Sequence, residues 1–119
     1  MFRAFYPDRY MVSAYVIDFE ELYKKGYRGL IFDIDNTLVP HGAPADDRAI
    51  RLFERLKKIG FQCCLISNNK EPRVKMFNEK IQVAYVYNAH KPSKKNYIKT
   101  LEIMGTERYS TVFIGDQLF

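Results

Sequence analysis

Four short apolar runs constrain the fold of this 119-residue chain more than any other feature. Each run is rich in branched or aromatic side chains and none alternates with polar residues; the runs occupy residues 29–32, 63–66, 83–86 and 111–114. Apolar runs without alternation are typical of strands that are buried on both faces, as in a parallel sheet. Helices must cover the two faces of such a sheet, so we expect an α/β fold.

The segments between these runs carry helical patterns. Residues 46–59 place apolar side chains on one stripe and are followed by Gly60, which suits the left-handed position after a helix. We expect two further helices near residues 72–81 and 93–104, and Asp18, with a glutamate three residues later, predicts the capped start of a short helix. Strands that alternate with helices predict a three-layer Rossmann-like sandwich around a parallel sheet.

Length and composition indicate a single domain. The chain is 47% hydrophobic and 28% charged, which is enough apolar material for one core and too much for a disordered chain. We interpret residues 1–119 as one domain, in which residues 1–27 form an N-terminal strap with the short helix and residues 28–119 form the core. The net charge of +5 comes from dispersed basic residues at spacings typical of solvated helix faces, so no nucleic-acid partner is expected.

The start of the chain is rich in aromatic residues but is interrupted by Arg3, Pro7 and Asp8. It therefore supports neither a signal peptide nor a membrane span. We interpret it as a strap that packs its aromatic side chains onto the domain, and a peripheral membrane contact remains the alternative. The adjacent Cys63 and Cys64 form no C-x-x-C motif, which favours a reducing, cytoplasmic setting.

Polar residues follow every predicted strand. In parallel α/β sheets ligands bind at the carboxyl ends of the strands, so these residues are expected to form a site. They stand at residues 33–37, 67–69, 88–91 and 115–116.

Three of these residues, Asp33, Asp35 and Asp116, would form an acidic cluster if the strand ends converge. Like-charge repulsion within such a cluster requires a cation, and oxygen ligands favour Mg²⁺. Ser67 offers a hydroxyl and Lys91 a positive charge, which are the groups expected around a phosphoryl oxygen. The sequence therefore predicts phosphoryl transfer.

The same residues resemble the four motifs of the haloacid dehalogenase (HAD) superfamily of phosphatases. Residues 33–37 resemble its D-x-D-x-T motif. The closer similarity is to the YqeG-like group of subclass IIIA, in which S-N-N-x-x-x-R-V and G-D-Q recur; here they stand at residues 67–74 and 115–117, with Lys91-Pro92 between them. The resemblance implies a HAD-like fold without a cap domain, and relatives of the group include phosphatidylglycerophosphate phosphatases.

The resemblance also implies a mechanism, that of a magnesium-dependent phosphate monoester hydrolase. Asp33 would be the nucleophile that forms an aspartyl-phosphate, and Asp35 would protonate the leaving oxygen and then activate water. The carboxylates of Asp33 and Asp116 and the backbone carbonyl of Asp35 would hold Mg²⁺. The residues that would bind the phosphate of the substrate are Ser67, Asn68 and Lys91.

Two functions stay open at this stage. The first is a phosphatase whose phosphorylated substrate is bulky, such as a lipid phosphate, because the segment between residues 37 and 46 is too short for a cap domain. Alternatively, a second subunit of an oligomer would cover the open site. The second function is a non-catalytic module that binds phosphate or regulates a partner.

The chain stops at Phe119, before the second carboxylate that usually follows the G-D pair in this family. We therefore expect a core truncated at its C-terminus, without the helix that would cover the last strand. The edge of the sheet beside residues 111–114 would then be exposed.

Four further polar residues have less certain roles in the sequence. Arg73 suits either the binding of a substrate anion or an exposed position in the first turn of a helix. We expect the hydroxyl of Thr37 to hold the turn that orients the two aspartates. His41 and His90 are expected to have surface or turn roles in loops.

Overall fold

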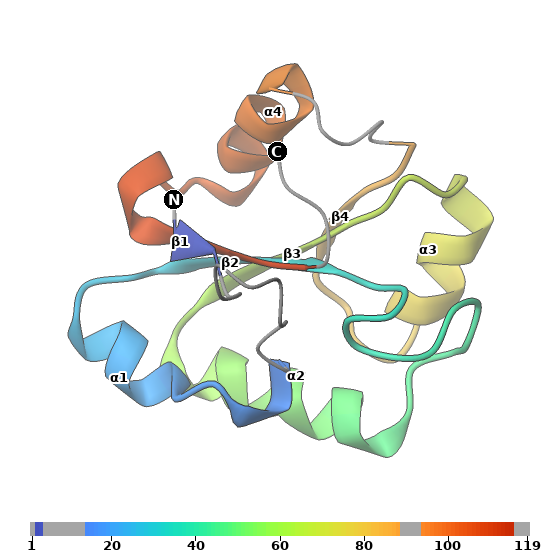
Figure 1. The fold of residues 1–119 in the computed structure, drawn as a ribbon, viewed down its shortest axis with the longest axis horizontal. Coiled ribbons are helices and arrows are strands. Elements are labelled where there is room, and N and C mark those ends of the chain that lie inside the picture. Colours follow the sequence, from blue (N-terminus) through green and yellow to red (C-terminus); the bar gives the residue numbers. More distant parts are fainter. Residues whose placement is uncertain (1, 4–13, 89–93, 116–119) are drawn as a thin grey trace, which may run out of the picture.

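A five-stranded parallel sheet forms the centre of the structure, a computed structural model that describes residues 2–3, 14–88 and 94–115 (Figure 1). The strand order is β1-β5-β2-β3-β4. The strands are β1 (Phe2–Arg3), β2 (Gly29–Asp33), β3 (Gln62–Ile66), β4 (Ala84–Val86) and β5 (Thr111–Ile114). The four predicted apolar runs are thus confirmed as β2 to β5, and all pair in parallel as expected.

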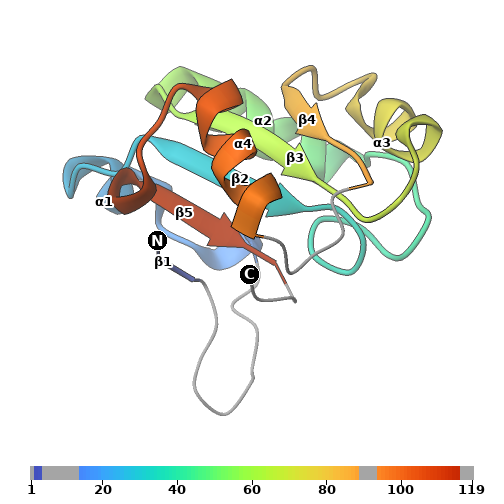
Figure 2. The same cartoon turned by 90° about the horizontal axis from the view of Figure 1, so that it is seen from above.

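Helices cover both faces of the sheet, which confirms the predicted three-layer sandwich. On one face lie α1 (Phe19–Lys24), α2 (Asp47–Ile59) and α3 (Glu71–Asn78), and on the other lies α4 (Lys94–Met104) (Figures 1 and 2). Two short 3₁₀ turns occur at Ala14–Val16 and Arg108–Ser110.

The central strand β2 divides its side chains between two apolar clusters. Leu30 and Phe32 belong to the larger cluster beneath α1, α2 and α3. Ile31 belongs to a smaller cluster in which Leu101 and Met104 of α4 take part. All five residues of β2 are buried, which explains why its sequence shows no alternation of apolar and polar residues.

Local side-chain chemistry fixes the ends of two predicted helices. The carboxylate of Asp46 accepts a hydrogen bond of 2.9 Å from the backbone N–H of Ala49 at the start of α2. Gly60 follows the helix with a φ of 117°, the left-handed conformation that was expected. At the start of α1, the side chain of Asp18 accepts a 3.0 Å hydrogen bond from the backbone N–H of Glu21.

Helix α3 ends three residues earlier than the apolar pattern predicts, at Asn78 rather than residue 81. The side chain of Asn78 donates to the carbonyl of Val83 at 2.9 Å and accepts from its N–H at 3.0 Å. These two bonds close a turn that leads into β4. The apolar Ile81 is buried without being helical, so the periodicity extends past the end of the helix.

The predicted exposed edge beside β5 is wrong. Phe2 and Arg3 pair in parallel with Val112 and Phe113, so β5 has neighbours on both sides at these positions. A strand of two residues carries no periodicity, and the sequence therefore gave no sign of it.

Residues 4–13 of the N-terminal strap lie outside the described residues. One of its members, Tyr15, does pack onto the domain: its hydroxyl donates a 2.7 Å hydrogen bond to the carbonyl of Leu38, and the guanidinium of Arg48 lies 3.8 Å from its ring centre. In the part of the chain that the structure describes, no helix has the length and apolar character needed to cross a bilayer.

The cap of α2 gives a first prediction. Asp46→Ala removes the acceptor of the Ala49 N–H and should lower the free energy of unfolding by about 0.5–2 kcal/mol. Asp46→Asn keeps an acceptor oxygen, so its free energy of unfolding should be close to that of the unaltered protein. Urea unfolding of the three proteins measures the difference, and equal stabilities of the Ala and Asn variants would contradict the capping role.

Candidate active site

The carboxyl ends of three neighbouring strands bring together those predicted site residues that the structure describes. Asp33 ends β2 and pairs with Ile66, the last residue of β3, and Ser67 follows directly after that strand. Phe32 pairs with Ile114 of β5. Asp33 and Ser67 are both only 4% exposed, and the predicted convergence of these strand ends is confirmed.

Gly115, directly after β5, lies against the carboxyl group of Asp33. A Cβ atom added at Gly115 would stand 2.5 Å from Oδ2 of Asp33 and 3.0 Å from its Cβ. Only a residue without a side chain leaves this space to the aspartate. Asp116 and Lys91 lie outside the described residues, so their roles stay predictions, and the same holds for His90.

Asp35 is held by donors from three different segments. Its Oδ1 accepts hydrogen bonds from the backbone N–H of Gly42 at 2.7 Å and from Nη2 of Arg73 at 2.8 Å. Its Oδ2 accepts a 2.9 Å hydrogen bond from the side-chain amide of Asn69. The Nδ1 atom of the exposed His41 lies 3.9 Å from Oδ1. Asp35 therefore connects the loop after β2 with the loop after β3 and with α3.

These contacts determine the charge state of Asp35. Burial raises the pKa of its carboxyl, but the hydrogen bonds from Arg73 and Gly42 and the positive charge of Arg73 lower it by more. The pKa of Asp35 consequently lies below its ordinary value. The carboxylate is the form that this arrangement holds.

The turn between the two aspartates and α2 is formed by the backbone. The N–H of Leu38 donates to the carbonyl of Ile34 at 3.0 Å, the N–H of Asn36 donates to Val39 at 2.8 Å, and Asn36 adopts a φ of 62°. The hydroxyl of Thr37 is buried and makes no hydrogen bond among the described residues. The predicted role of that hydroxyl in holding the turn is therefore not confirmed.

The loop after β3 is fixed by backbone and hydroxyl contacts. The N–H of Asn69 donates to Oγ of Ser67 at 3.0 Å, and the carbonyl of Asn69 accepts a 2.8 Å bond from the N–H of Asn88, after β4. Asn68, predicted to bind phosphate, is exposed at the same strand end. Ser67 and Asn68 are thus in place at the edge of the sheet to which the sequence assigned them.

The sequence placed Asn69 among the polar residues at the strand ends but gave it no role, and it left Arg73 between two interpretations. For Arg73, the interpretation as an exposed residue of the first helical turn is wrong. Only 13% of its side chain is accessible, and it forms an ion pair with Asp35. Both residues belong to the S-N-N-x-x-x-R-V pattern, which was the available signal. His41 is 76% exposed, as expected for a loop histidine.

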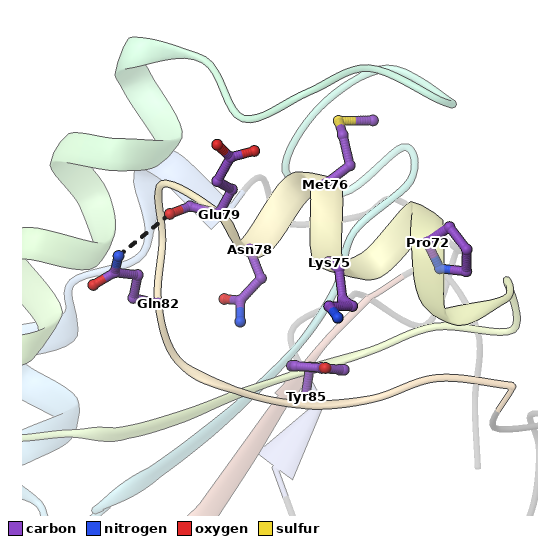
Figure 3. A pocket seen from close by; sticks show the side chains of 7 residues that line it. All are labelled: Pro72, Lys75, Met76, Asn78, Glu79, Gln82 and Tyr85. Carbon is purple, nitrogen blue, oxygen red and sulfur yellow. Dashed lines mark hydrogen bonds between the residues drawn. The ribbon is translucent and has the colours of Figure 1, made fainter.

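A hollow of about 720 Å³ lies elsewhere, between α3 and β4 (Figure 3). It is lined by Pro72, Lys75, Met76, Asn78, Glu79, Gln82 and Tyr85. A smaller hollow of about 370 Å³ adjoins the turn after Asp35 and is lined by Arg48 and residues 36–40. Since neither aspartate faces the larger hollow, the candidate chemistry belongs to the strand ends.

The described strand ends supply part of the donor set expected for magnesium, and the magnesium site stays a prediction. Both carboxylate oxygens of Asp35 already accept hydrogen bonds, which leaves its backbone carbonyl as the oxygen to offer a cation. Asp33 supplies a carboxylate, a hard ligand of the kind that Mg²⁺ prefers. Among the described residues no three acidic, histidine or cysteine side chains converge, and the third expected ligand, Asp116, lies outside them.

The chain is similar to one curated protein in sequence and to a solved structure in fold, and no family model matches the sequence. The chain is 37% identical over 115 residues to "Probable phosphatase YqeG" of Bacillus subtilis (strain 168), covering 96% of this chain and 67% of that protein. The crystal structure of a hypothetical protein from Xanthomonas campestris superimposes with a TM-score of 0.65 at 16% identity, covering 91% of this chain and 66% of the other. The second likeness supports the fold alone.

The contact between Gly115 and Asp33 gives a second prediction. Gly115→Ala places a methyl group against Asp33 and the ring of Phe113 and should cost about 1–3 kcal/mol in unfolding free energy. In an Asp33→Ala background the carboxylate is gone, so part of this cost should disappear. Thermal unfolding of the unaltered protein, the two single variants and the double variant measures these costs. Equal costs of Gly115→Ala in both backgrounds would show that the two residues are not in steric contact.

Proposed function

Because this chain belongs to the YqeG family of HAD-type phosphatases, we propose that it hydrolyses phosphate monoesters in two steps through an aspartyl-phosphate on Asp33. The observation that carries the proposal is the contrast between the two aspartates. Asp33 is buried at the end of β2, whereas Asp35 is held by the cationic Arg73 and by two further donors. Two acids in such different surroundings suit two different roles.

In the first step, a carboxylate oxygen of Asp33 attacks phosphorus, and the bond from phosphorus to the leaving oxygen breaks. Asp35 gives a proton to that oxygen, so the alcohol leaves uncharged. In the second step, water attacks the same phosphorus while Asp35 accepts its proton, and inorganic phosphate departs from Asp33. The first step needs the protonated form of Asp35 and the second needs its carboxylate form, and the lowered pKa of Asp35 favours the second of these forms.

The remaining residues bind the substrate and a metal ion. Ser67, Asn68 and Lys91 bind the oxygens of the transferring phosphoryl group. Asp33, the carbonyl of Asp35 and Asp116 hold Mg²⁺. When bound, the ion supplies positive charge that reduces the repulsion between the nucleophile and the phosphate.

The substrate that we propose is a bulky phosphate monoester, of which a lipid phosphate such as phosphatidylglycerophosphate is one example. Support comes from the short loop between Asp35 and α2, which is folded back onto Asp35 through Gly42. This loop holds no cap domain that could enclose a small substrate. The bulk of the substrate itself would then exclude water from the reacting phosphate.

Substitution of each aspartate is the main test of this function. Asp33→Asn should abolish turnover, whereas Asp35→Asn should slow it by ~10²–10⁴-fold through loss of acid and base assistance. The Asp35 variant should be impaired less on p-nitrophenyl phosphate, whose leaving group needs little protonation, than on an alkyl phosphate. Labelled phosphate should accumulate on Asp33 of this variant; its appearance on Asp35 would reverse the assigned roles.

Metal removal provides a separate test. Treatment with a chelator should abolish turnover, and added Mg²⁺ should restore it. Mg²⁺ should also raise the melting temperature of the unaltered protein, because a ligand that binds the folded state stabilises it, and should raise it less in Asp33→Asn. Full turnover in the presence of the chelator would exclude the magnesium role, and binding of phosphate without any turnover would favour the non-catalytic module.

A further inference from the structure

Arg73 occupies an unusual place for a cation. It lies in the first turn of α3, where the helix dipole disfavours positive charge, and its side chain turns inward. Only 13% of the side chain is accessible, and a buried charge is costly unless it is paired. Its partner is Asp35, whose Oδ1 lies 2.8 Å from Nη2.

The other contacts of Asp35 come from two different loops. Asn69, which donates to Oδ2 of Asp35, is itself fixed by its backbone bonds to Ser67 and Asn88. Gly42 donates from the backbone of the opposite loop. The carboxylate is therefore held on both oxygens, and the same network reaches the hydroxyl of Ser67.

Two further donors of Arg73, Nε and Nη1, are buried and have no hydrogen-bond partner among the described residues. The ion pair with Asp35 is thus the main described polar interaction of the guanidinium. This geometry is compatible with two roles of Arg73, and the two predict different effects of its substitution on kcat and KM. Arg73 can act through Asp35, or it can bind the substrate phosphate with its remaining donors.

We propose that Arg73 is a positioning residue of the phosphatase reaction, which together with Asn69 fixes the carboxylate of Asp35 in the orientation used for proton transfer. The proposal rests on the function proposed above. It gives Asn69 and Arg73, two residues of the S-N-N-x-x-x-R-V pattern, one shared role, which is to hold the carboxylate of Asp35. The ion pair and the amide contact favour this role over direct phosphate binding, because they engage both oxygens of Asp35 before any substrate is present.

The kinetic test compares Arg73→Gln in two backgrounds, the unaltered protein and Asp35→Asn. In the unaltered background, kcat on an alkyl phosphate should fall by about 10–100-fold, as is typical when a supporting residue is removed. The loss on p-nitrophenyl phosphate should be smaller, and KM should change little. In the Asp35→Asn background, the same substitution should change kcat by less than about twofold, because the residue it acts through is already disabled.

Matched variants separate positioning from general damage. Asn69→Ala should reproduce the dependence on the leaving group, and Arg73→Lys, which keeps one donor for Oδ1, should recover part of the loss. Lys75→Gln removes an exposed cation from the same helix and should leave kcat unchanged. A rise of KM in both backgrounds, or equal losses on both substrates, would overturn the proposal in favour of phosphate binding or a purely structural role.

A measurement without substrate distinguishes failure of this proposal from failure of the proposed function. Urea unfolding of the unaltered protein, Arg73→Gln, Asp35→Asn and the double variant gives the coupling between the two residues. The effect of Arg73→Gln on the unfolding equilibrium constant should be several-fold larger when Asp35 is present. Additive effects would overturn the pairing whatever the activity, whereas absence of turnover in the unaltered protein with Mg²⁺ would refute the phosphatase function.

Discussion

Burial of β2 between two parallel neighbours is the constraint on which the candidate site depends. All five residues of the strand are buried, and its last residue, Asp33, brings a carboxyl group to a position that is only 4% exposed. Because the neighbouring strands run in the same direction, their ends meet at that point, with Ser67 on one side and Gly115 on the other. The burial of the strand thus places a carboxyl group at the point where three strand ends meet.

The chain leaves the sheet directly after Asp33, and this change of direction gives the two aspartates different surroundings. Ile34 is buried and accepts backbone hydrogen bonds from the turn, which places Asp35 beyond the strand. There the side chain meets Arg73 and Asn69 rather than the core. One residue of separation therefore suffices to place one acid at the edge of the core and the other in a polar network.

The sequence predicted those features that depend on local patterns. The apolar runs located β2 to β5, and Asp46 and Gly60 marked the ends of α2, because burial and capping leave a signature within a few residues. The polar residues after each strand located the candidate site, because parallel topology determines where strand ends meet.

Features that depend on contacts between distant segments were beyond sequence reasoning. The pairing of β1 with β5 joins opposite ends of the chain, and the ion pair of Asp35 with Arg73 spans 38 positions. Neither leaves a periodic pattern. Thr37 shows the opposite case: its side chain suggested a hydrogen bond in the turn, but the backbone of residues 34–39 makes the bonds that hold it.

The network around Asp35 also bears on how open the site is. Gly42 donates to Oδ1 of Asp35, and Asp35 forms an isolated bridge with Val39, so the loop that leads to α2 is bound to the acid at two points. The loop is thus kept close to the acid from Val39 to Gly42. The short loop and the tightly held acid are in this sense two consequences of one arrangement.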